Sequence, residues 1–147
     1  MRLSLGYMRR EDEMTVIGRE DPLTILEQLQ PVLSREELLQ LRREYRDVKV
    51  QADVAGYLMD IIQATRKHER IMVGASTRAA QNLYQAAQVT AALHGHDYVI
   101  PEDVKELASA VLCHRLVFRG KLRMEEQLRI FAELLSRISV PGETTEG

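Results

Sequence analysis

The chain has 147 residues, which is the size of one domain and enough to bury an ordinary core without disulfides. Its formal net charge is -2 at pH 7 and its pI is about 6.1, which argues against binding of a nucleic-acid backbone. Cys113 is the single cysteine, so a disulfide framework is excluded and a reducing compartment is indicated. The start, MRLSLGYMRRED, lacks the apolar segment of a signal peptide, and no run is long enough to span a membrane. We therefore expect a cytoplasmic protein without a membrane or nucleic-acid partner.

The first residues alternate in polarity. Met1, Leu3, Leu5 and Tyr7 are apolar, and the residues between them are polar or glycine. This period of two predicts a β-strand. A lone strand leaves its backbone donors and acceptors unpaired, and the remainder of the chain offers almost no sheet for it to join.

The next segments carry helix signals. The stretch Glu11–Ile17 is a short helix candidate, and Asp21-Pro22 supplies a cap and a first-turn proline for a helix that ends before Pro31. Ser34-Arg35-Glu36-Glu37 is a capping box, in which serine and glutamate side chains pair with each other's backbone N–H groups. It predicts another helix directly after Ser34.

Four further helices are predicted from apolar residues at helical spacing. Ser76 is the expected N-cap of the longest of them, and Gly95 its expected C-cap. Two short runs, Val48–Val50 and Tyr98–Ile100, have strand character and should lie side by side. The fold class is therefore all-α, a small helical bundle with at most a minor two-stranded β pair. The four helices are expected at Ala52–His68, at Ser76–His94, from Pro101 and from about Met124.

Motifs for independent catalysis are missing from this sequence. No GxxxxGK[ST] phosphate loop is present. His94-x-His96 could bind a metal ion, but no third ligand at a sensible spacing stands near it, so we expect two polar loop residues and no metal site. Cys113 and His114 are adjacent on a helix and point about 100° apart, which is poor geometry for a nucleophile and its base. Cys113 is interpreted as a core residue.

Arg78 stands out in the stretch VGASTRAAQ. If Ser76 caps the helix, Arg78 lies in its first turn, where the helix dipole disfavours a cation by roughly 0.3–1 kcal/mol. A plain exposed arginine is one explanation. The other is an anion bound jointly by the helix N-terminus and the guanidinium, with Ser76 and Thr77 as weaker contributors.

Three motifs resemble the C-terminal helical lid of MoxR-type AAA+ ATPases. GASTRA is similar to the family's GASPRA, HDYVIPEDVKELA to its DYVTPEDVKALA, and VLCHRL to its VLRHRL. Upstream, LSREELLQL and IIQATR also follow the family's lid, and MRLSLGY resembles the last strand of the ATPase core. Two positions depart from the pattern: Thr77 replaces a proline, and Ile100 replaces a threonine cap.

The resemblance implies that the sequence begins inside an ATPase, downstream of its Walker A and Walker B motifs. Residues 1–17 would then be the end of the ATPase core and a connecting segment, residues 18–140 the lid, and residues 141–147 a disordered tail. Arg78 would be the second sensor arginine, which reaches the γ-phosphate of ATP. The chain alone should bind neither ATP nor Mg²⁺, which belong to the parent ATP hydrolase.

The family further implies hexameric rings, a chaperone-like role in maturing protein complexes or cofactors, and a von Willebrand factor A domain partner. Partners of the chain would be its own ATPase core and neighbouring subunits. Two alternatives stay open. One is a stand-alone helical interaction module without a nucleotide role. The other is a histone-like fold, against which the negative net charge argues.

Overall fold

The structure is a computed structural model that describes residues 1–3, 5–18 and 26–142. Its contacts divide the chain into two compact units. The smaller unit comprises residues 3–41, and the larger comprises residues 1–2 and 42–147. Within the described ranges, no helix combines the length and the apolar character needed to cross a membrane.

The smaller unit contains helix α1, Arg10–Ile17, and the start of helix α3, Arg35–Glu44. The helix expected at Glu11–Ile17 is therefore confirmed. The predicted capping box is also present, because the Ser34 N–H donates to Glu37 Oε2 at 2.7 Å and the Glu37 N–H donates to Ser34 Oγ at 3.1 Å. Asp21 and Pro22 lie outside the described residues, whereas residues 26–28 are helical.

The strand expected at the start of the chain does not form in the described part of that segment. Residues 1–3 and 5–7 have no strand assignment. The backbone N–H of Arg2 instead donates to the Ala110 carbonyl at 2.8 Å. Alternating polarity does not suffice for a strand, because a strand also requires a neighbouring ladder to pair its backbone.

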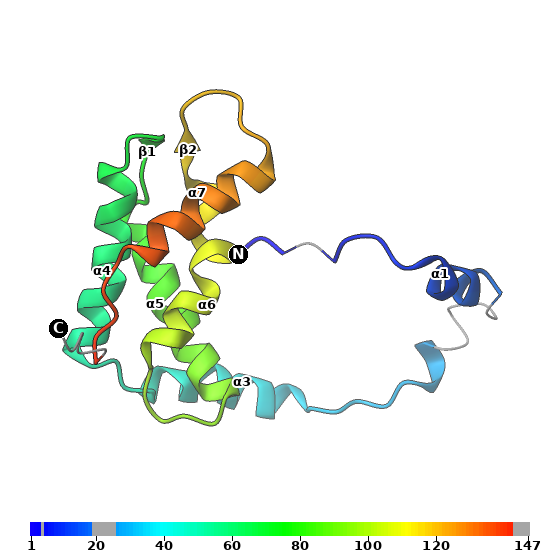
Figure 1. The fold of residues 1–147 in the computed structure, drawn as a ribbon. Coiled ribbons are helices and arrows are strands. Elements are labelled where there is room, and N and C mark those ends of the chain that lie inside the picture. Colours follow the sequence, from blue (N-terminus) through cyan, green and yellow to red (C-terminus); the bar gives the residue numbers. More distant parts are fainter. Residues whose placement is uncertain (4, 19–25, 143–147) are drawn as a thin grey trace. The chain divides into compact units, whose positions relative to one another are not determined.

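Four helices build the larger unit, in agreement with the predicted all-α bundle. They are α4 (Ala52–Lys67), α5 (Thr77–Leu93), α6 (Pro101–Leu112) and α7 (Met124–Ser136). Helix α5 packs against both α4 and α6, and α7 packs against α4 and α6 (Figure 1). Short 3-10 turns, Tyr45–Asp47 and Cys113–Arg115, follow α3 and α6. The largest fully buried side chains in the described core come from all four helices and the turn before α6: Phe131, Ile61, Ile62, Leu83, Leu112, Val99, Val104, Thr65 and Asp103.

Two kinds of β contact supplement the helices. Val48–Val50 and Tyr98–Ile100 lie side by side as predicted, but they share a single parallel bridge between Lys49 and Tyr98 and do not form full strands. The sheet that does form in the described residues was not predicted. Strand β1, Ile71–Val73, pairs antiparallel with strand β2, Val117–Phe118. This sheet fixes the segment that leads from α4 into α5.

Candidate functional site

Arg78 lies in the first turn of α5, as predicted. The helix begins at Thr77, and Ser76 is its N-cap, whose Oγ accepts a hydrogen bond from the Ala79 N–H at 3.2 Å. The Arg78 side chain is exposed, and no ion pair or hydrogen bond joins it to another residue in the part of the chain that is described. The guanidinium is therefore available to an external partner.

The N-terminus of α5 differs from the N-termini of the other helices whose two ends both lie in the described residues. Helices α1, α3, α4, α6 and α7 each carry acidic residues in the first turn, whereas α5 carries none. Acidic side chains there offset the positive end of the helix dipole. Helix α5 has a cation at that position instead. Its first two backbone N–H groups, of Thr77 and Arg78, also have no partner within the described ranges. Both features make this helix start attractive to an anion.

The turn before α5 is fixed against the end of α4. The buried Ala75 N–H donates to Thr65 Oγ1 at 2.9 Å, and the Ala75 carbonyl accepts from Arg66 Nε at 2.9 Å. Thr65 Oγ1 in turn donates to the Ile62 carbonyl at 2.7 Å. Gly74 passes so close to α4 that an added Cβ would lie 2.7 Å from the Arg66 Cα. These contacts set the direction in which α5 starts and so place Arg78.

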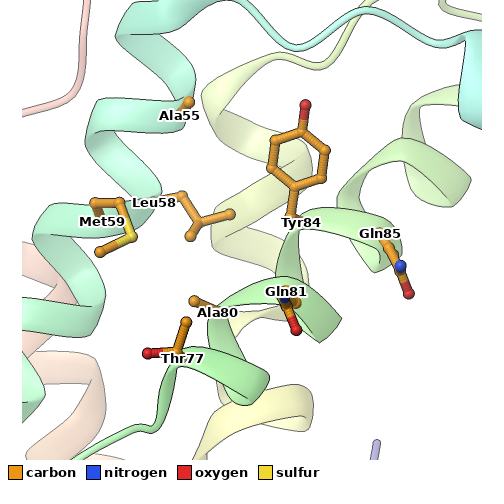
Figure 2. A pocket seen from close by; sticks show the side chains of 8 residues that line it. All are labelled: Ala55, Leu58, Met59, Thr77, Ala80, Gln81, Tyr84 and Gln85. Carbon is orange, nitrogen blue, oxygen red and sulfur yellow. The ribbon is translucent and has the colours of Figure 1, made fainter.

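A pocket opens beside the same helix start. It has a volume of ≈ 410 Å³ and lies between α4 and α5. Figure 2 shows Leu58 and Met59 of α4 facing Thr77 and Ala80 of α5, with Tyr84 one turn further along. The lining is mainly apolar, so the pocket suits an apolar group, and Thr77 connects it to the turn that carries Arg78.

Replacement of Ser76 tests the local architecture of this turn. Because the Ser76 hydroxyl satisfies the Ala79 N–H, Ser76→Ala should lower the free energy of unfolding by about 1 kcal/mol. Ser76→Asn keeps a capping acceptor and should retain most of the stability. Urea unfolding of the two variants beside the unmodified chain checks this expectation. Equal losses in both variants would contradict the capping role.

A second polar group forms where α5 turns into α6. His94, His96 and Asp103 present ligand atoms that all lie within 4.8 Å of one another. The expectation that His94-x-His96 lacks a third ligand is therefore wrong. Asp103 lies nine positions after His94, in the first turn of α6, and the turn between the helices brings that first turn beside the end of α5. Sequence spacing alone gave no signal of this proximity.

The adjacent Cys113 and His114 do not form a reactive site. Cys113 is buried, and burial raises the pKa of its thiol, which disfavours the thiolate that a nucleophile needs. His114 is exposed, and its Nε2 accepts from Arg115 Nε at 3.3 Å. Cys113 belongs to the hydrophobic core, which confirms its interpretation from the sequence.

Comparison with known proteins matches part of the larger unit to a known domain family. Residues 63–134 match the AAA lid domain family. The chain is 33% identical over 142 residues to the uncharacterised protein YeaC of Bacillus subtilis, covering 95% of this chain and 44% of YeaC. It is 34% identical over 125 residues to the chaperone MoxR1 of Mycobacterium tuberculosis, covering 79% of this chain and 33% of MoxR1.

A crystal structure shows the same fold. It is that of a candidate ATPase from Cytophaga hutchinsonii, which superposes with a TM-score of 0.77 at 29% identity and covers 92% of this chain and 44% of that one. The chain thus spans less than half the length of each of these three proteins.

Proposed function

Because this chain belongs to the AAA lid domain family and has a MoxR chaperone among its relatives, we propose that it is the nucleotide-sensing, subunit-contacting lid of a MoxR-type AAA+ ATPase. The ATPase core, with bound ATP and Mg²⁺, would lie in the remainder of a longer protein. The coverage of the relatives supports this proposal, since each is more than twice as long as the part that this chain matches.

The observation that carries the proposal is the start of α5. Arg78 projects an unpaired guanidinium from the start of α5. Among the helices whose two ends are both described, α5 is the one whose first turn lacks an acidic residue. A γ-phosphate would bind the guanidinium and face the free N–H groups of Thr77 and Arg78. Ser76 contributes by holding the turn in place.

The energies favour this role. A hydrogen bond between a charged donor and an anion is worth about 1.5–3 kcal/mol, whereas the dipole penalty for Arg78 is roughly 0.3–1 kcal/mol. Without a bound anion the arginine has no compensation for this penalty within the described residues. A phosphate contact therefore gives a reason for a cation at this position.

The pocket between α4 and α5 supports a contact role for the lid. Its lining includes Met59 and Tyr84, which are large and partly exposed. An apolar surface of this kind gains stability when another surface covers it. In the proposed assembly the ATPase core or a neighbouring subunit of a hexamer covers it.

The wider role follows from the family resemblance. The parent protein would act in the cytoplasm as a chaperone-like regulator that matures protein complexes or their cofactors, with a von Willebrand factor A domain protein as a partner. Within the chain, residues 18–140 would be the lid and residues 1–17 the end of the core and its connection. The competing proposal is a stand-alone helical interaction module without a nucleotide role.

ATP turnover separates the two proposals. We expect no hydrolysis by the purified 147-residue chain, because it lacks a phosphate loop and the groups that bind magnesium. A longer protein that carries this chain after an ATPase core should hydrolyse ATP. Turnover by the chain alone, free of contaminating ATPase, would contradict the lid assignment. A gene that encodes no upstream GxxxxGK[ST] would favour the interaction module.

A further inference from the structure

The turn between α5 and α6 gathers two imidazoles and a carboxylate. His94 Nδ1 lies 3.1 Å from Asp103 Oδ1, and His96 Nδ1 lies 3.9 Å from Asp103 Oδ2. Asp103 is almost fully buried, with 1% of its side chain exposed, whereas the histidine side chains are 47% and 37% exposed. The group therefore has a buried carboxylate on its inner side and two imidazoles that solvent can reach on its outer side.

Backbone hydrogen bonds hold these residues in place. The Gly95 N–H donates to the Ala92 carbonyl and the His96 N–H to the Ala91 carbonyl, which is the Schellman pattern of a helix end. Gly95 has a φ of 78°, a conformation that favours glycine. Because this pattern fixes the backbone on both sides of Gly95, it also fixes the positions from which the two imidazoles project.

Asp103 is held from the other side. Its Oδ2 accepts a hydrogen bond from the Ile100 N–H at 3.0 Å, and Ile100 follows the bridge between Lys49 and Tyr98. Asp103 therefore closes the start of α6, where Ile100 has no side-chain acceptor of its own. The same hydrogen bond orients the carboxylate, as outer-shell partners do for ligands in metal sites.

One polar atom in this group has no hydrogen-bond partner among the described residues. His96 Nδ1 is buried and forms no hydrogen bond with the described residues. An unsatisfied buried polar atom costs about 1–3 kcal/mol. Capping of α6 explains Asp103 and its contact with His94, and the His96 ring packs against Tyr98, but His96 Nδ1 is left without a hydrogen bond among the described residues. A cation that binds the lone pair of His96 Nδ1 and balances the negative charge of Asp103 would account for all three residues.

We propose that His94, His96 and Asp103 bind a Zn²⁺ ion, with water in the remaining position. Two imidazoles and a carboxylate are ligands that Zn²⁺ commonly takes. In a tetrahedral site, ligand atoms about 2.1 Å from Zn²⁺ lie about 3.4 Å apart, so rotations of the partly exposed imidazoles would have to shorten the present separations of up to 4.8 Å. The ion would join the end of α5 to the first turn of α6. This inference does not depend on the role of Arg78.

Titration of the full metal-free chain with Zn²⁺ in a calorimeter tests the site. We expect saturable binding of one ion per chain. His96→Ala and His94→Ala should each weaken the affinity by more than the roughly 10- to 100-fold that loss of an outer-shell partner costs. His114→Ala is the matched control, because His114 is exposed and lies outside the group, and it should bind as the unmodified chain does.

Thermal unfolding gives a second readout that does not depend on heats of binding. Zn²⁺ should raise the Tm of the unmodified chain and of His114→Ala, and should leave the Tm of His96→Ala unchanged. Circular dichroism establishes that each variant is folded. Absence of saturable binding by the unmodified chain would overturn the proposal, and so would equal affinity in the His96→Ala and His114→Ala variants.

Discussion

Gly74→Ala should destabilise the chain by about 3 kcal/mol, at the upper end of the cost of overpacking. The added Cβ would lie 2.7 Å from the Arg66 Cα and 2.8 Å from its backbone nitrogen. Those atoms belong to α4, so relief requires a shift of backbone and not the rotation of a flexible side chain. The expected measurement is a fall in the free energy of unfolding in urea.

The matched control for this substitution is Gly56→Ala. Gly56 lies inside α4, and a Cβ added there would meet nothing within 4 Å. Alanine favours a helix over glycine by about 1 kcal/mol, so this variant should be more stable than the unmodified chain. Opposite signs for the two substitutions are the expected result. A neutral Gly74→Ala would show that the turn before α5 is looser than the structure indicates.

The parts of the fold that depend on near neighbours in sequence were predictable. The Ser34–Glu37 capping box and the Ser76 cap each involve residues three positions apart, so the sequence contains the whole interaction. The apolar spacing likewise predicted α4 to α7, with bounds close to those observed. Arg78 was expected in a first turn for the same reason, and it lies in the first turn of α5.

Features that join distant segments were missed. Strands β1 and β2 are short and lie far apart in sequence, so neither has a pattern that identifies its partner. Asp103 lies in the first turn of the helix expected from Pro101, and its approach to His94 depends on how α5 turns into α6. Thr65 lies on the buried side of α4, but its hydrogen bond to the Ala75 N–H could not be inferred without the path of the intervening turn.

Arg78→Ala should separate activity from stability. In a longer protein that contains the ATPase core, loss of the guanidinium–phosphate contact should lower ATP turnover about 10- to 100-fold, the equivalent of about 1.5–3 kcal/mol. In the 147-residue chain the same change removes a cation from the positive end of α5, so the stability should stay the same or rise slightly. Arg78→Lys should restore turnover only in part, because lysine keeps the charge without the planar fork.

Arg129→Ala serves as the charge-matched control. Arg129 is an exposed residue of α7, a different helix from the one that carries Arg78, and its removal should change neither turnover nor stability. A loss of turnover shared by both variants would indicate a general effect of net charge. A loss confined to Arg78→Ala would locate the effect at the start of α5.

The most direct test of the lid assignment is the ratio of ATP turnover in Arg78→Ala to that in the unmodified longer protein, measured together with the Tm of both 147-residue chains. A phosphate contact of Arg78 predicts a turnover ratio of about 0.1 or lower with a Tm that is unchanged or slightly higher. Unchanged turnover would contradict the phosphate contact. A marked fall in Tm would show that Arg78 is a structural residue of the lid.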